Sequence, residues 1–151
     1  SAEHYRGFLN EAARARWQRP LSDEAVNLIL KRSQRQPFYV NSLCGRLWDE
    51  RQPPTTSTVD QAWAEVVEES TPVVTERVGG LSATPPALLI GIANAGRVEQ
   101  PTSQAFLASI RLSASTGSNA KDVLESQDFI RPDLEGGWFI VDPVMYSYLT
   151  R

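Results

Sequence analysis

The sequence is poor in the residues that most often carry catalysis and metal binding. Among its 151 residues it has one cysteine, Cys44, and one histidine, His4. A single cysteine excludes an internal disulfide bond and is typical of a reducing, cytoplasmic setting. A Cys–His or Ser–His couple would have to be built from His4, close to the N-terminus, and no His/Cys cluster is present for structural zinc. We therefore expect no catalytic residue and no metal site.

Long apolar runs and the motifs of nucleotide hydrolysis are also absent. No apolar stretch approaches the roughly 18 residues of a membrane-spanning helix. The chain has no glycine-rich phosphate loop of the GxxxxGK[ST] type and no strand-borne acidic motif that could hold magnesium. Phosphoryl transfer depends on both for positioning and charge neutralisation. We expect that the chain is not an enzyme by itself, and, because it starts at Ser1 without a signal peptide, that it is a piece of a longer protein.

Apolar residues make up 41% of the chain, enough to bury a core, and the net charge is −3. The charge is unevenly distributed along the sequence. Residues 1–52 hold nine Lys/Arg against six Asp/Glu, whereas residues 53–151 hold six against twelve. The two parts are therefore expected to face different neighbours.

Apolar residues recur at helical spacing in three segments of the first part. The pattern predicts helices over residues 3–17, from the capping residue Ser22 onwards, and from Pro37 to about Trp48. Cys44 lies on the apolar stripe of the third helix, which favours an inert core thiol. Pro53-Pro54 and the Thr/Ser residues around them then indicate a linker, so that residues 1–52 form a first helical subdomain.

Residues 53–80 are predicted to be a linker with connecting helices. Thr58 and Gln61 have capping-box spacing, and Pro72 is expected to open a second short helical stretch. Trp48 and Trp63 flank the linker and are predicted to dock the first subdomain onto the last.

Residues 81–151 have a different pattern. Ser82 is predicted to cap a first helix, Pro101 to open a short second one, and Ser113 to cap a third that ends near Ser126. Two short extended segments around Gly136-Gly137 predict a hairpin, and Asp142-Pro143 a last helix. Three helices followed by a hairpin is the order of a winged helix-turn-helix domain. The predicted fold class is therefore mainly α: a helical subdomain, then a winged helix-turn-helix domain with a small two-stranded wing.

Two stretches resemble a known family. The segment LSDEAVNLILKRSQRQPFYVNSLCGRLWDE (residues 21–50) resembles the helical lid of archaeal-type ATPases of the STAND/AAA+ superfamily, in which a Gly-x-Pro-aromatic turn joins two helices and a Leu-Trp pair ends the second. The segment 81–150, which ends in GGWFIVDPVMYSYL, is similar to the winged helix that follows this lid.

The resemblance implies a regulatory role next to a nucleotide site. In such ATPases the nucleotide lies between an α/β core and the lid, and the winged helix helps to hold a closed, inactive arrangement. Carried over, Pro37 would contact adenine, with Arg35 and Gln36 beside it. ATP or ADP would be bound by the full-length parent, with no cofactor held by this piece alone. The family prefers glycine where Arg35 stands, and glycine permits a positive backbone φ; Arg35 could reach a phosphate or be a solvated turn residue.

Two functions, and a purely structural alternative, are compatible with these features. In the first, this region is the C-terminal regulatory part of a nucleotide-switch ATPase, and its partner is the upstream core or another protein. In the second, it is the DNA-binding domain of a transcription-related regulator. Five basic residues against seven acidic ones in 81–151 disfavour DNA, because duplex binding depends on neutralising phosphates. A structural spacer is the third reading. The candidate DNA contacts lie on the predicted third helix and the wing: Ser113, Ser115, Thr116, Ser118, Asn119, Lys121 and Arg131.

Overall fold

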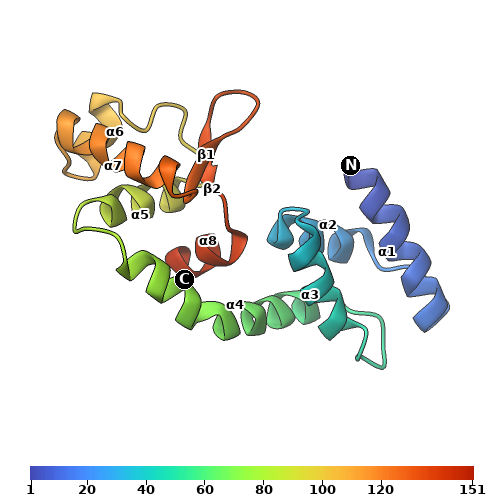
Figure 1. Cartoon of the computed structure of the whole chain (residues 1–151). Helices are drawn as coiled ribbons and strands as arrows, with labels where there is room; N and C mark the ends of the chain where they lie inside the picture. The colour runs from blue at the N-terminus through green and yellow to red at the C-terminus, as the bar shows by residue number, and fades with distance from the viewer. The chain divides into compact units, whose positions relative to one another are not determined.

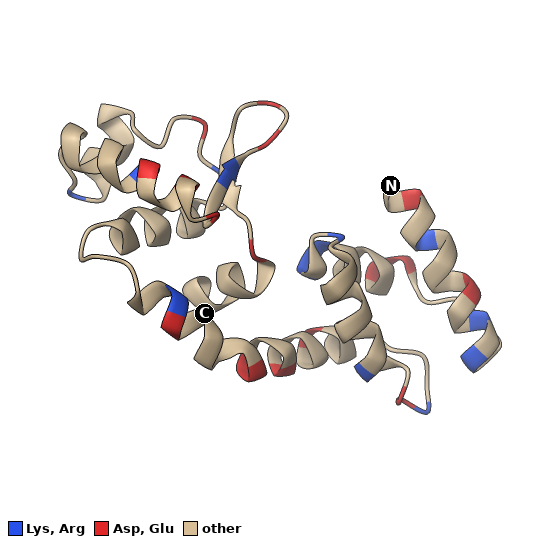
Figure 2. Ribbon diagram, in the orientation of Figure 1, with Lys and Arg blue, Asp and Glu red and all other residues tan.

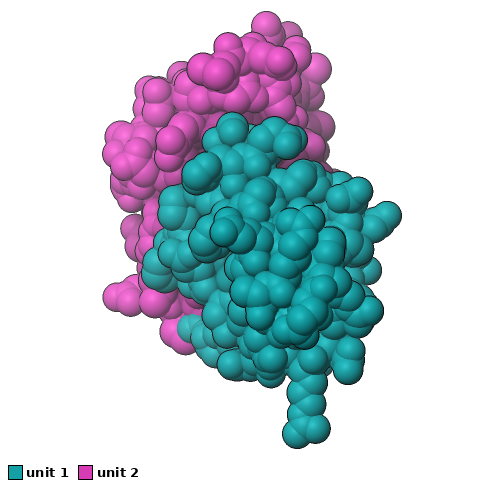
Figure 3. Space-filling model, turned by 90° about the vertical axis from the view of Figure 1, so that its right-hand side faces the viewer, with its two compact units in different colours: residues 1–69 teal, residues 70–151 magenta.

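Eight helices and one two-stranded antiparallel sheet make up the protein in a computed structural model that describes residues 1–151 (Figure 1). The predicted mainly α fold class, with its small two-stranded wing, is confirmed. The chain divides into two compact units, unit 1 (Ser1–Glu69) and unit 2 (Ser70–Arg151), which Figure 3 colours separately. None of the helices combines the length and the apolar character needed to cross a membrane.

Unit 1 consists of α1 (Ala2–Trp17), α2 (Asp23–Ser33), α3 (Pro37–Leu47) and the first part of α4 (Thr56–Gly79). The helices predicted in residues 1–52 are confirmed. Ser22 caps α2, since its Oγ accepts the Ala25 N–H at 3.2 Å. Helix α3 starts at Pro37, where the lack of an N–H has no cost. The core of unit 1 includes Leu9, Ala13, Trp17, Ala25, Ile29, Val40, Leu43, Leu47 and Val59.

Helix α4 differs from the prediction at its start and at Pro72. It starts one turn earlier than expected, because Thr55 and Thr58 cap it reciprocally: each backbone N–H donates to the other's Oγ1, at 3.2 and 3.4 Å. It also continues through Pro72, where a new helix was expected to open. The compact units divide after Glu69, inside this helix, whereas the predicted divisions lie after residues 52 and 80.

The two tryptophans that were expected to dock the subdomains have partners inside unit 1. The Trp48 ring lies against Trp17, with centroids 4.9 Å apart. Trp63 is 4% exposed, and its ring meets Tyr39 edge-on at 5.8 Å. Trp63 is therefore part of the core of unit 1, and the half-buried Trp48 packs on Trp17 in the same unit. Their docking role stays a prediction.

Unit 2 contains the end of α4, then α5 (Pro85–Ala95), α6 (Gln104–Ser109), α7 (Ala114–Ser126), β1 (Ile130–Pro132), β2 (Trp138–Ile140) and α8 (Pro143–Thr150). The strands pair with Ile130 opposite Ile140. Val98 adds a bridge to Trp138, with N–H···O distances of 2.9 and 2.7 Å. This third extended segment was not predicted, because a single apolar residue between Arg97 and Glu99 gives no strand pattern.

Of three predicted helix starts in unit 2, that of α7 is confirmed, whereas α5 and α6 start later than expected. Ser113 caps α7 as expected, accepting the Thr116 N–H at 3.3 Å. Helix α6 begins later than expected, because the capping hydroxyl is that of Ser103. Helix α5 begins at Pro85 rather than after Ser82; its first two residues are prolines, which have no N–H for a cap to satisfy.

Helices α6 and α7 form the helix-turn-helix pair, and they approach each other closely at Gly117. A Cβ on Gly117 would lie 2.5 Å from both Cδ atoms of Leu107, which is 1% exposed. Only a residue without a side chain fits α7 at this distance from α6. This contact fixes the position of α7, the helix that carries most of the candidate DNA contacts.

Candidate functional surface of the winged helix

The exposed side of α7 carries small polar side chains and carboxylates. Gly117, Ala120 and Leu124 are buried beneath it. Besides Ala114, the exposed residues are Ser115, Ser118, Asn119, Asp122, Glu125 and Ser126. Figure 2 shows no continuous run of Lys and Arg along this helix. The surface can form hydrogen bonds, but it has little positive charge.

Two of the predicted DNA contacts take part in the helix start itself. Ser113 Oγ accepts the Thr116 N–H, and the two hydroxyl oxygens lie 2.7 Å apart in a hydrogen bond. Thr116 is half-buried. Both hydroxyls therefore stabilise the first turn of α7, which leaves Ser115, Ser118 and Asn119 as its outward polar residues.

Lys121, the single basic residue of α7, is engaged within unit 2. Its Nζ lies 3.2 Å from a carboxylate oxygen of Glu125, one turn further along. The same ammonium lies 4.0 Å from the ring centroid of Trp138 on β2, a cation–π distance. Trp138 thereby joins the wing to α7 and holds the lysine that a phosphate would otherwise attract.

Arg97 binds the wing from the segment that follows α5. Its Nε and Nη2 donate to the two carboxylate oxygens of Asp133 at 2.5 and 3.2 Å. This hydrogen-bonded pair raises the pKa of Arg97 and lowers that of Asp133 to about 2. A Cβ on Gly137 would lie 2.1 Å from Arg97 Cζ, so in this position the guanidinium packs against the bare backbone of Gly137. Arg97 is thus committed to holding the hairpin.

A third cation, Arg77 at the end of α4, is also used inside unit 2. Its Nη1 lies 3.7 Å from Asp142, and its guanidinium carbon lies 4.8 Å from the Phe129 ring centroid. Asp142 at the same time caps α8, as predicted, by accepting the Val144 N–H at 2.9 Å. The contact therefore joins α4 to the segments on either side of the hairpin.

Three arginines of unit 2 are exposed and form no ion pair: Arg111, Arg131 and the C-terminal Arg151, whose guanidinium lies over the Tyr148 ring. Arg131 on β1 lies opposite Phe139, and it is one of the predicted contacts. Arg111 lies in the turn between α6 and α7 with φ 61°, and sequence reasoning did not select it. Its position in a tight turn directly before the capping serine of the third helix is the signal that could have identified it.

The three nucleotide-contact candidates lie in the turn from α2 to α3. Gln34 and Arg35 both have positive φ, 50° and 58°, and the Arg35 N–H donates to Leu30 O at 3.2 Å. Gln36 precedes α3 and Pro37 begins it, with Arg35 and Pro37 exposed. Arg35 thus adopts the left-handed conformation that glycine adopts at lower cost.

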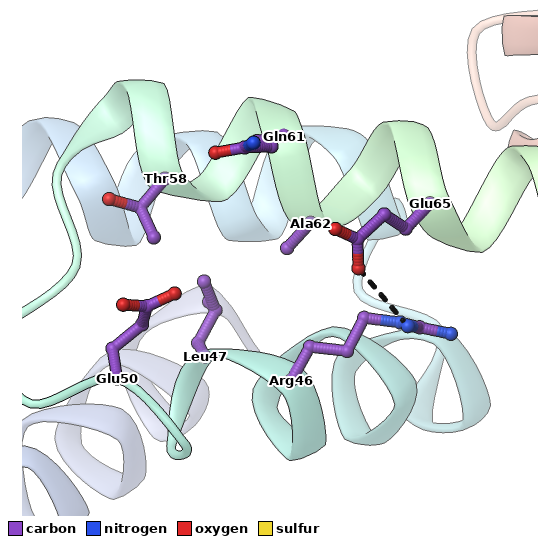
Figure 4. A pocket seen from close by; sticks show the side chains of 7 residues that line it. All are labelled: Arg46, Leu47, Glu50, Thr58, Gln61, Ala62 and Glu65. Atoms are coloured by element: carbon purple, nitrogen blue, oxygen red, sulfur yellow. Dashed lines mark hydrogen bonds and ion pairs between the residues drawn. The ribbon is translucent and has the colours of Figure 1, made fainter.

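Unit 1 contains two hollows. One, of about 140 Å³, lies between α3 and α4, and there Arg46 donates to Glu65 at 3.3 Å (Figure 4). Arg46 also donates to Glu69. The other, of about 280 Å³, lies between α1 and α3 and is mostly apolar, with Phe8, Cys44 and Trp48 in its lining. Burial raises the pKa of the Cys44 thiol to about 11, so it stays protonated at neutral pH. No group of His, Cys, Asp or Glu side chains is placed to hold a metal ion.

The helix-turn-helix pair, the hairpin bridged by Val98 and the closing α8 define unit 2 as a winged helix domain. The family model described as "probable winged helix domain" matches residues 73–151, which is more than half of the chain. The chain belongs to this family. No curated protein and no solved structure matches it.

Proposed function

We propose that the chain is a regulatory module whose winged helix contacts protein rather than DNA. The observation that carries this proposal is the internal use of positive charge: Lys121, Arg97 and Arg77 each bind carboxylates of unit 2 itself. Unit 2 has six basic residues against eight acidic ones, a net charge of −2 that the pairs leave unchanged. Duplex binding gains most of its free energy from phosphate neutralisation, and this surface has little charge to offer.

We infer further that unit 1 serves as the lid of a nucleotide-switch ATPase. Its support is the α2–turn–α3 arrangement, in which Arg35 has the positive φ of a glycine position and Pro37 is exposed beside it. In this proposal ATP or ADP belongs to the upstream core, which is also the first partner of the winged helix. The chain itself is not an enzyme and holds no cofactor alone.

DNA binding is the second candidate, and a specific observation favours it. Arg111 and Arg131 are both exposed without carboxylate partners, one in the turn before α7 and one on the wing. Ser115, Ser118 and Asn119 could donate hydrogen bonds to phosphates or base edges. Such a surface would have two cations, so the salt dependence of binding would correspond to roughly two released counterions.

A titration of labelled duplex DNA, followed by fluorescence anisotropy at rising salt, separates the two functions. We expect no saturable binding at low salt. Micromolar binding that weakens with salt, and that Arg111→Ala and Arg131→Ala abolish, would refute the protein-facing proposal. Glu125→Gln, which releases Lys121 from its ion pair and raises the net charge of α7, is the comparison variant, and any binding that appears should be stronger in it than in the wild type. Incubation of the chain with ATP checks the statement that the chain alone is not an enzyme, and it is expected to yield no ADP.

A further inference from the structure

Helix α4 contains a segment, residues 68–73, in which no side chain is buried. Immediately before it, Val66 and Val67 are 5% and 8% exposed, and immediately after it Val74 is 3% exposed. Within the segment, Pro72 is exposed and Val73 is 61% exposed. Burial of an apolar face is the main source of helix stability in proteins, and among these six residues only Ser70 and Thr71 are even half-buried.

The residues of this segment are also weak helix formers. Pro72 has no N–H, so the Glu68 carbonyl loses its helical donor, and the proline ring presses against that carbonyl. Ser70, Thr71 and Val73 each favour helix less than alanine does. The helix is therefore weakest where its burial is lowest.

The part of α4 before this segment is fixed to unit 1 by ion pairs. Arg32, on α2, forms an ion pair with Asp60 on α4, with an N···O distance of 3.0 Å. Arg46 binds both Glu65 and Glu69 from α3, as Figure 4 shows for Glu65. The second of these carboxylates, Glu69, is the last residue of unit 1 and the second residue of the segment 68–73, so the fixed part of the helix ends at the start of this segment.

The part of α4 after the segment is fixed to unit 2 by different side chains. Arg77 contacts Asp142 and the Phe129 ring. The Thr75 hydroxyl lies 3.3 Å from the hydroxyl of Tyr148 on α8 and donates to it. The buried Val74 begins this part. Each half of one continuous helix thus belongs to a different compact unit.

We propose that α4 opens at residues 68–73 and acts as a hinge. Local loss of helix there lets the two units change orientation relative to each other, while each half of α4 keeps its contacts within its own unit. The hinge goes beyond the protein-facing role proposed above and does not depend on it. It would also operate in a DNA-binding winged helix.

Amide hydrogen exchange tests the local opening. We expect the amides of residues 69–71 and 73 to exchange faster than those of residues 60–66 and 74–78. Pro72→Ala, which restores the missing donor, should slow exchange at residues 69–71 on the order of a hundredfold. Pro20→Ala, at an exposed proline between α1 and α2, is the matched control and should leave α4 unchanged. Uniform protection along α4, or no response to Pro72→Ala, would overturn the proposal.

A distance measurement tests whether the opening reorients the units. Spin labels on Glu24→Cys in α2 and Ser118→Cys in α7, both exposed, would be placed in a Cys44→Ala background. We expect a broad distance distribution with Pro72 and a narrower one with Pro72→Ala, while Pro20→Ala leaves it broad. Two outcomes would refute the hinge: a narrow distribution with Pro72 present, or a width that Pro72→Ala does not change. In either case the segment does not reorient the two units.

Discussion

The close contact of Gly117 with Leu107 makes Gly117→Ala a direct test of how α6 and α7 pack. Two opposing effects set its magnitude. Alanine in place of a helix-interior glycine stabilises by about 1 kcal/mol. The new methyl group, however, would lie 2.5 Å from both Cδ atoms and 3.0 Å from Cγ of a leucine that is 1% exposed. Overpacking of this kind costs about 1–3 kcal/mol, so we expect Gly117→Ala to destabilise unit 2 by about 1 kcal/mol.

Gly45→Ala provides the matched control for this substitution. Gly45 also lies inside a helix, α3, but a Cβ there meets no atom within 4 Å. Its replacement should therefore show the helix-propensity gain alone, about 1 kcal/mol. Calorimetric melting of both variants should give shifts of opposite sign, roughly 4–8 °C each for units of this size. A rise in melting temperature for both would show that α6 and α7 are not in close contact at Gly117.

Three further outcomes follow from local geometry. Arg35→Gly should stabilise unit 1 by about 1 kcal/mol in urea unfolding, because it relieves a positive φ, and a loss of stability would contradict the turn geometry. Cys44, with its pKa raised to about 11, should react with a disulfide reagent at neutral pH on the order of a hundredfold more slowly than an exposed thiol, and Phe8→Ala should speed the reaction. Asp133, whose pKa falls from 3.8 to about 2 on folding, should stabilise unit 2 above pH 4 and lose that contribution as the pH drops towards 2. An unfolding series in which Asp133→Asn shows the same acid dependence as the wild type would disprove that assignment.

Local signals in the sequence predicted much of the fold. Ser22, Ser113 and Asp142 cap the helices that they were expected to cap, because a cap depends only on residues two or three positions away. The apolar periodicity of α1 to α3 was sufficient to predict these helices, because it too depends only on residues three or four positions apart. Helix α4 was misread at Pro72, since a proline normally ends a helix, and the buried residues on both sides of it are what carry the helix through.

The electrostatics of the candidate surface were not predictable in this way. Arg97 and Asp133 are far apart in the sequence, and nothing local relates one to the other. Lys121 could be paired with Glu125 from helical spacing, but its contact with Trp138 requires the wing to fold back against α7. A sequence-based charge count therefore overstates the positive charge that unit 2 offers to a ligand.

The same pairs also bear on what a partner of the winged helix would have to be. Each ion pair of Arg97 and Lys121 would have to be broken before the cation could bind a phosphate, and the carboxylate left behind would repel the same strand. A protein surface makes no such demand, because it can accept hydrogen bonds from Ser115, Ser118 and Asn119 and leave the internal pairs intact. The geometry that stabilises the wing thus works against DNA binding, and this connection between fold and charge supports the protein-facing role more strongly than the net charge does.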